Sequence, residues 1–276
     1  MPHKDLLKGA AAVLALMVAT SASADLVLST QPRGPHSEVD KPFEELAAYL
    51  SQATGTTVTY KYIDTWLAYA IEMQKGRFDI VFDGPAFVSW RMLHRDHEVL
   101  VKVAGAPGRH VVAVRKENAK FKTIHDLAGH RICGRPTPNL SSLVMLNEFP
   151  NPSRQPLIVP AESYDDAFEK MMENRCAGAV VSESKFKKLN EKDVARAVIV
   201  TEPLPKQAIS AGPNVTPEQK RKIHEALAAP DAEKYLGTFL KKYADGKPFE
   251  AADPAAYRDH HILLKNEWGF GEKASR

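Results

Sequence analysis

No apolar run in the sequence is long enough to cross a membrane. The longest, residues 10–19, spans about ten residues, half of the roughly 20 that a membrane-spanning helix requires. We therefore expect no stable membrane insertion.

An excess of charge of one sign is also lacking. The 37 lysines and arginines are nearly balanced by 34 aspartates and glutamates, for a net charge of +3, and neither kind forms a block. Nucleic-acid-binding domains carry clustered basic side chains instead. We therefore expect no nucleic-acid partner.

The first 24 residues have the pattern of a cleavable secretory signal. Lys4 and Lys8 precede or flank the start of the apolar run, which is followed by Ala22-Ser23-Ala24. No cysteine stands at the expected cleavage point near Ala24, so a lipid anchor is not predicted. The mature chain is expected to begin at Asp25 and to reside in the periplasm as a monomer.

Cysteine is scarce, with only Cys133 and Cys176. In an exported chain, an even pair more often forms a disulfide than a catalytic or metal site. An enzyme using Cys133 with His130 or His110 as base is the alternative. It is disfavoured because a bonded Cys133 could not act as nucleophile, and no Gly-x-Ser-x-Gly motif is present. We predict no catalytic residue.

Short aliphatic runs alternate with helical patterns along the chain, which is typical of βα units and predicts an α/β fold with parallel, doubly wound sheets. The predicted strands are residues 26–29, 58–63, 78–82, 99–104, 110–114, 131–134, 157–159, 177–181 and 208–210. The predicted helices are residues 43–52, 66–74, 85–93, 141–148 and 164–173.

The order of these elements predicts two lobes. About 250 residues usually divide into two domains. A turn-rich segment near residue 105 and a proline-rich one after residue 203 suggest two chain crossings. We predict a discontinuous first lobe, residues 25–105 plus 207–276, with residues 106–206 inserted as the second. The tail is predicted to be helical, with an N-cap and capping box at Thr216-Pro217-Glu218-Gln219.

In such sheets ligands bind where strand ends lead into helix N-termini, whose free N–H groups and dipole attract anions. The leading candidates lie in one such turn of the second lobe. They are Thr137, Asn139, Ser141 and Ser142. Alternatively, one of them only caps the following helix.

Five more candidates lie in the first lobe. Asp83, Gly84 and Pro85 form either part of the ligand site or a cap and turn. Trp66 and Tyr69 would place aromatic faces against the ligand, or belong to the core.

Positive charge for an anionic ligand is available at Arg33, near His36, and at Arg109. Ser182 follows a predicted strand of the second lobe and completes the candidate set.

Two histidine groups suggest a metal site as a further alternative. They are His94-Arg95-Asp96-His97 and His260-His261. Neither has the spacing of known ligand sets, so surface histidines are the simpler interpretation. We expect no metal and no cofactor.

Three segments carry a resemblance to a known family. They are the stretch from Gly76 to Pro85, the stretch from Asp126 to Cys133, and Ile209-Ser210-Ala211-Gly212-Pro213. Together they resemble the periplasmic substrate-binding proteins of phosphate, phosphite and phosphonate ABC transporters, which have the type II periplasmic binding protein fold. The resemblance covers essentially the whole mature chain.

The resemblance implies a Venus-flytrap cleft that closes on a small oxyanion and presents it to an ABC transporter permease, without catalysis. It places the ligand turn at Thr137 to Ser142, which here contains two prolines and no glycine after the serines. It also makes the strands that carry Cys133 and Cys176 neighbours, so that a bond between them is feasible. A ligand-sensing partner of a signalling receptor is the alternative role for the same fold.

Overall fold

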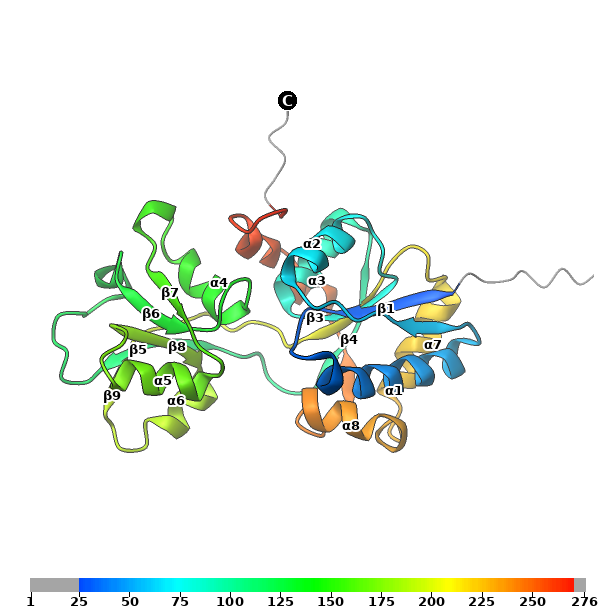
Figure 1. The fold of residues 1–276 in the computed structure, drawn as a ribbon. Helices are drawn as coiled ribbons and strands as arrows, with labels where there is room; N and C mark the ends of the chain where they lie inside the picture. The colour runs from blue at the N-terminus through cyan, green and yellow to red at the C-terminus, as the bar shows by residue number, and fades with distance from the viewer. Residues whose placement is uncertain (1–24, 271–276) are drawn as a thin grey trace, which may run out of the picture.

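The structure is a computed structural model, and it describes residues 25–270. The predicted secretory signal, residues 1–24, lies outside the described residues. The described chain forms two α/β lobes, each built around its own sheet (Figure 1). The predicted fold class, two lobes of the type II periplasmic binding protein kind, is confirmed.

The first lobe contains a six-stranded mixed sheet with the order β11-β4-β10-β3-β1-β2. Its strands are β1 (Leu26–Thr30), β2 (Val58–Tyr60), β3 (Ile80–Asp83), β4 (Glu98–Val103), β10 (Ala208–Ala211) and β11 (Phe249–Ala251). The pairs β1–β2 and β1–β3 are parallel, whereas β10 is antiparallel to both β3 and β4.

Helices cover both faces of this sheet because each carries an apolar stripe at helical spacing. One face packs against α1 (His36–Thr54), α7 (Pro217–Ala228) and α8 (Glu233–Tyr243). The other packs against α2 (Trp66–Gln74), α3 (Pro85–His94) and the 3₁₀-helix η4 (His260–Leu264). A further 3₁₀-helix, η3 (Pro254–Tyr257), precedes η4.

The second lobe contains a five-stranded sheet with the order β7-β6-β8-β5-β9. Its strands are β5 (His110–Arg115), β6 (Arg131–Gly134), β7 (Leu157–Pro160), β8 (Gly178–Ser182) and β9 (Ala195–Val200). On one face lie α5 (Tyr164–Met172) and α6 (Glu183–Leu189), and on the other lie α4 (Leu140–Asn147) and the 3₁₀-helix η1 (Ile124–Leu127). A short 3₁₀-helix, η2 (Pro152–Arg154), links α4 to β7.

The two sheets share one topology. In each, the first strand of a βαβ series is central, the second lies outside it, and the third lies on its other side. The strand that follows a chain crossing pairs with this third strand in the antiparallel direction. It is β10, beside β3, in the first lobe and β5, beside β8, in the second. The predicted parallel arrangement therefore holds for β1, β2 and β3 and for β6, β7 and β8, whereas the strand that arrives from the other lobe enters each sheet in the opposite direction.

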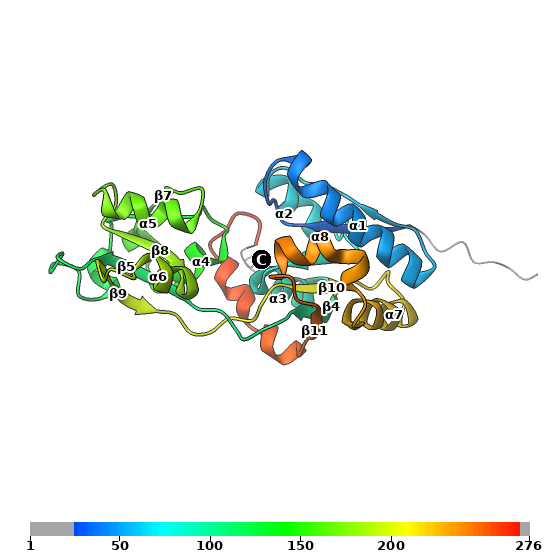
Figure 2. The same cartoon turned by 90° about the horizontal axis from the view of Figure 1, so that it is seen from below.

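Two chain segments, residues 104–109 and 201–207, join the lobes (Figure 2). Gly108 and Leu204 form an isolated antiparallel bridge between them, in which each backbone N–H donates to the carbonyl of the other residue at 2.8 Å. This pairing gives the connection a fixed register. The lobe limits at 105/106 and 206/207 stay a prediction.

The last described residues, 260–270, which we call the tail from here on, make a third contact between the lobes. Leu264 and Phe270 pack in one apolar cluster with Phe87 of α3 and with Leu143 of α4, which belongs to the second lobe. Both views show the tail lying between α3 and α4 (Figures 1 and 2). Lobe movement must therefore act against this apolar contact as well as the two crossings.

Several predicted boundaries required correction. Helix α1 begins at His36, well before Pro42, although the prediction started it after that proline. Five elements were not predicted: β9, β11, α6 and the 3₁₀-helices η1 and η2. The α7 start was confirmed in full, since the Thr216 side chain accepts from the Gln219 N–H and the Gln219 side chain accepts from the Thr216 N–H.

The predicted disulfide between Cys133 and Cys176 is present. Cys133 lies on β6, which pairs with β8, and Cys176 lies two residues before β8 begins. The two Cα atoms are 5.7 Å apart, and both residues are buried in the second lobe's core.

No helix within residues 25–270 is long and apolar enough to span a bilayer.

Two buried histidines make stability depend on pH. Burial lowers the pKa of His97 to about 3 and that of His110 to about 4. The unfolded imidazole gains a proton near pH 6.5, whereas the folded one stays neutral until near these lower values, so stability is lost as pH falls through this window. From pH 6.5 to 5, we expect each histidine to lower the free energy of unfolding by about 2 kcal/mol.

Urea unfolding at pH 7, 6 and 5 measures this effect. A His97→Leu variant should show a clearly smaller slope than the wild type between pH 6.5 and 5, because only His110 and the partly buried His260, whose pKa burial also lowers, still contribute. Equal free energies at pH 7 and 5 would contradict the prediction.

Candidate functional site

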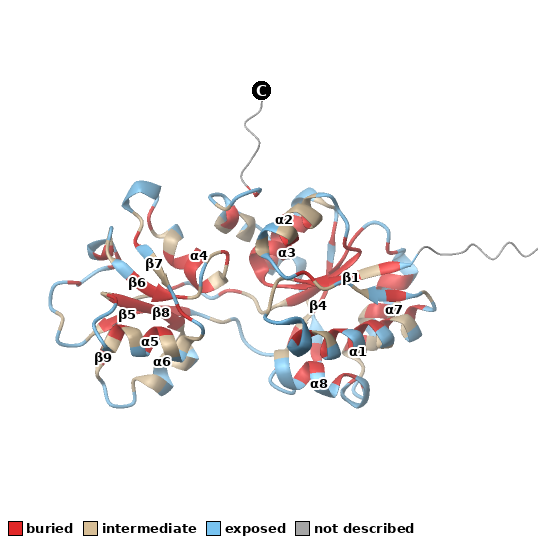
Figure 3. Cartoon of the chain, viewed as in Figure 1, coloured by how far each residue is buried: buried red, intermediate tan, exposed pale blue. Residues whose placement is uncertain are grey.

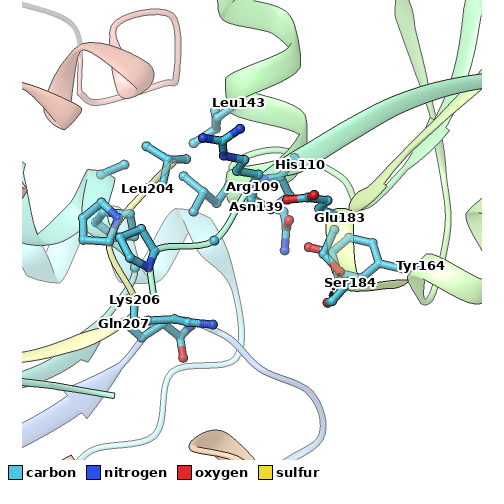
Figure 4. Close-up of a pocket in the computed structure, with 18 of the residues that line it drawn as sticks. Arg109, His110, Asn139, Leu143, Tyr164, Glu183, Ser184, Leu204, Lys206 and Gln207 are labelled. Atoms are coloured by element: carbon cyan, nitrogen blue, oxygen red, sulfur yellow. Dashed lines mark hydrogen bonds between the residues drawn. The ribbon is translucent and has the colours of Figure 1, made fainter. Parts of the chain in front are cut away.

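A pocket of about 470 Å³ opens between the lobes, at the chain crossings. Each lobe has its own buried core (Figure 3). Figure 4 shows Arg109, His110 and Asn139 gathered on one side of the pocket and Lys206 and Gln207 on another.

The first lobe contributes the carboxyl ends of β1 and β3 and the start of α3. Gln31, Gly84, Pro85 and Phe87 line the pocket here. Gly84 is the N-cap of α3 and Pro85 is its first residue. The first-turn N–H groups of a helix have no acceptor within the helix, so this end carries partial positive charge.

The second lobe contributes the start of α4, which the sequence predicted as the ligand turn. Asn139 is the N-cap: its Oδ1 accepts from the Ser141 backbone N–H at 3.2 Å and from the Ser141 hydroxyl at 2.8 Å. The Ser142 hydroxyl donates to the Arg135 carbonyl. Both serines are fully buried, and of these three residues only Asn139 lines the pocket. Asn139 therefore caps the helix, which is the alternative considered for this turn, and both serine hydroxyls have partners within the turn.

Thr137 does not line the pocket and lies close to the Glu267 carboxyl in the tail. Burial raises the pKa of Glu267, and Thr137 offsets part of that rise. Thr137 thus ties the α4 turn to the tail.

The cations of the pocket lie mainly on the chain crossings. Arg109 follows Gly108 on the first crossing, and Lys206 lies on the second. Neither has an ion-pair partner among residues 25–270. At the start of α6, the Lys187 ammonium lies 2.7 Å from the Glu183 carboxylate and lowers its pKa. The pocket therefore carries an excess of positive charge.

Asp83 and Tyr69 belong to the interior of the first lobe. The Asp83 carboxylate is fully buried and pairs with the Arg91 guanidinium, which is 1% exposed. The Tyr69 hydroxyl donates to Asp83 Oδ2 at 2.5 Å, and Arg91 Nη2 donates to the Tyr69 oxygen at 2.6 Å. Burial would lower the pKa of Arg91, but Asp83 and Tyr69 more than offset this and raise it. The structure does not bring either candidate into the pocket.

Arg33 and Trp66 do not line the pocket either. Arg33 Nε donates to Thr30 Oγ1 at 2.8 Å, and its guanidinium carbon lies 4.8 Å from the centre of the Phe82 ring. Burial lowers the pKa of Arg33. Trp66 stacks on Phe87 with ring centres 5.6 Å apart. His36, the other cation predicted in this loop, lies in α1 with its Nδ1 2.6 Å from the Asp40 carboxylate.

The structure thus brings five of the candidates together around the pocket and places the other seven elsewhere. The five are Gly84, Pro85, Arg109, Asn139 and Ser182. Ser182 is also the N-cap of α6, where its hydroxyl accepts from the Lys185 N–H. Their contact with a ligand stays a prediction.

Sequence reasoning missed eight polar residues of the pocket wall as ligand contacts. They are Gln31, His110, Tyr164, Glu183, Ser184, Lys187, Lys206 and Gln207. The position of Lys206 and Gln207 on a chain crossing was the available signal, since both crossings must pass the cleft between the lobes. Burial raises the pKa of Tyr164, whose hydroxyl hydrogen-bonds Ser141 beneath the pocket wall.

The histidine groups proposed as an alternative metal site have other neighbours. His97 is buried, with its Nδ1 3.2 Å from the Ser210 hydroxyl, and His261 Nδ1 lies 3.4 Å from the Ser89 hydroxyl. Within residues 25–270, no group of three or more His, Cys, Asp or Glu side chains is arranged to hold a metal ion.

Two lobes of equal topology, two crossings and a polar pocket between them define a solute-binding protein of the type II periplasmic class. The chain belongs to the family described as the periplasmic substrate-binding protein of phosphonate ABC transporters, whose model matches residues 28–257. Members of this family are binding components of transporters that act outside the cytoplasm, not enzymes. Comparison of the sequence with curated proteins gives no match.

Solved structures show the same fold at low identity. XAC2383 from Xanthomonas citri bound to chloride has a TM-score of 0.67 and 15% identity, covering 89% of this chain and 97% of that one. PhnD1 from Prochlorococcus marinus in complex with methylphosphonate has a TM-score of 0.61 and 15% identity, covering 87% and 97%. A binding protein component of a phosphonate ABC transporter from Pseudomonas aeruginosa has a TM-score of 0.57 and 13% identity, covering 88% and 85%.

Proposed function

We propose that this protein binds a small oxyanion, such as a phosphonate, phosphite or phosphate, between its lobes and delivers it to an ABC importer. The observation that carries this proposal is the charge of the pocket. Within residues 25–270, Arg109 and Lys206 have no ion-pair partner, and the one acid that lines the pocket, Glu183, is already paired with Lys187. An anion entering here would meet an uncompensated positive field.

The helix starts in the pocket wall add to this field. Gly84 and Pro85 of α3 and Asn139 of α4 place two helix N-termini at the pocket, one from each lobe. Helix N-termini favour anions through their free N–H groups and dipole. An anion between them would draw both lobes together, which is the closure that a two-lobed carrier requires.

The ligands named for structures of the same fold support this class. PhnD1 was solved with methylphosphonate, and XAC2383 was solved with chloride and with ATP. All of these are anions, bound by proteins whose TM-scores to this chain exceed 0.6.

A thermal-shift series tests the ligand class. Methylphosphonate, phosphite, phosphate, sulfate and acetate would each be added to the purified mature chain. A ligand at about 100 times its dissociation constant adds roughly 2.7 kcal/mol of stability, so a true ligand raises the unfolding midpoint. We expect a phosphorus oxyanion to give the largest rise, and a set of anions that leaves the midpoint unchanged would overturn the proposal.

Matched arginine variants locate the binding site. We expect Arg109→Ala to weaken anion binding by about 10- to 100-fold, because a hydrogen bond to a charged group is lost. Arg221→Ala is the control, since this arginine lies on α7 and pairs with Glu218 and Glu225. Equal affinities of the two variants would place the anion elsewhere.

A further inference from the structure

The imidazole of His110 lies in the pocket wall with a ring nitrogen that has no partner. His110 is 8% exposed, and its Nδ1 is buried without a hydrogen bond. Within residues 25–270, three other buried side-chain atoms share this condition, on Asp40, Gln74 and Tyr243, and none of those residues lines the pocket. Buried polar atoms in native proteins are nearly always paired, so this exception requires an explanation.

The backbone of His110 is held firmly in place. Its N–H donates to Thr201 Oγ1 at 3.0 Å, and its carbonyl accepts from the Thr201 N–H at 2.9 Å. On the other side it pairs with Ser182 of β8. The unpaired nitrogen therefore belongs to a rigid strand end at the first chain crossing, where main-chain disorder cannot account for it.

The ring is uncharged at neutral pH, because burial lowers the pKa of His110 to about 4. A neutral imidazole offers one N–H donor and one lone pair. A half-turn of the ring about its Cβ–Cγ bond exchanges Nδ1 with Cδ2 and can turn that nitrogen toward the pocket without moving the backbone.

We propose that His110 is a specificity-determining ligand contact, whose free ring nitrogen is paired by a hydrogen-bonding group of the bound ligand. This inference rests on the proposed function and assigns a different task to each residue type. Arg109 and Lys206 recognise the charge of the ligand, whereas the neutral ring recognises one hydroxyl or one oxygen acceptor. Among ligands of equal charge, the protein would then bind more tightly those that present such a group to the His110 ring.

The proposal predicts opposite changes in stability and affinity. An unpaired buried polar atom destabilises the ligand-free protein, and an apolar side chain of similar size removes that penalty. His110→Leu should therefore raise the unfolding midpoint of the ligand-free protein by about 2 °C or more. The same variant should bind the ligand about tenfold more weakly. Replacing a histidine with only a structural role would not raise the unfolding midpoint and at the same time weaken ligand binding.

Isothermal titration calorimetry of the mature chain tests the inference, with methylphosphonate as the probe or whichever anion shifts the wild-type midpoint most. His110→Asn retains a polar atom near the Nδ1 position and His110→Gln near Nε2, and we expect one of the two to keep an affinity within about threefold of the wild type. His97→Leu is the control. This histidine is also buried but pairs with Ser210 outside the pocket, so its loss should lower stability and leave affinity unchanged.

Wild-type affinity in His110→Leu, or a lowered midpoint in that ligand-free variant, would overturn the assignment of His110 while leaving the proposed function intact. Binding of none of the anions by the wild type would overturn the proposed function, and this inference with it.

Discussion

Replacing Asp83 with asparagine is expected to lower the free energy of unfolding by about 3 to 5 kcal/mol, because it leaves a buried charge without its counter-ion. The Arg91 guanidinium is 1% exposed and pairs with the Asp83 carboxylate. Among residues 25–270 the guanidinium has no second ion-pair partner, and its Nη2 donates to the Tyr69 oxygen. Urea unfolding of Asp83→Asn against the wild type measures the loss.

A double variant distinguishes the cost of leaving one buried charge unpaired from the contribution of the ion pair itself. Asp83→Leu with Arg91→Met removes both charges, and such apolar replacements are often neutral or stabilising. We therefore expect the double variant to be more stable than Asp83→Asn. If Asp83→Asn loses less than about 1 kcal/mol, the buried ion pair does not make the contribution assigned to it here.

Asp83 also links the first-lobe core to the pocket. It is the last residue of β3 and directly precedes the α3 cap, and its Oδ1 accepts from the Gln31 N–H at 3.3 Å. Gln31 and Gly84 both line the pocket. The sequence showed that Asp83 stands at a strand end, but its partner lies eight residues further on, across the first two turns of α3. Only the packing of α2 against α3 brings Arg91 and Tyr69 to the same carboxylate.

Elements with strong local signals could be predicted from the sequence. The α7 start has its capping residues within four consecutive positions, and α2 has the predicted bounds, Trp66–Gln74. The two edge strands β9 and β11 lack such signals. In β9 the alternation of side chains between the two faces of the sheet is interrupted. The interruption lies where the pairing of β9 with β5 shifts register, between Val112 and Ala113 of β5. The three residues of β11 are held in the sheet by their pairing with β4.

In the ligand turn, the local sequence predicted the backbone turn but not the directions of its side chains. Asparagine, threonine and serine at residues 137–142 predicted a strand-to-helix turn at the cleft, and Asn139 does line the pocket. The serine hydroxyls instead bond to Asn139 and to the Arg135 carbonyl, and Thr137 contacts Glu267 from the far end of the chain. These directions depend on tertiary contacts. His110 is a similar case, because its burial follows from strands β8 and β9 on either side of β5.

Removing the disulfide is expected to destabilise the second lobe by about 4 kcal/mol. The bond joins residues separated by 43 positions, and the chain-entropy estimate for a loop of that length gives about this value. A Cys133→Ala, Cys176→Ala double variant avoids buried unpaired thiols or hydroxyls. Guanidinium unfolding of the variant and of the oxidised wild type measures the difference.

Reduction and thiol titration provide the controls. A reductant should destabilise the wild type and leave the double variant unaffected, and the unfolded, unreduced wild type should show no titratable thiol. Titratable thiols in that state would contradict the bond and restore the alternative in which Cys133 is a free nucleophile. The bond closes a loop that contains Asn139 and Tyr164, and β8 beside it ends at Ser182. Because all three residues line the pocket, loosening this loop should also weaken anion binding, whereas the Asp83–Arg91 pair and the first-lobe core should keep their stability.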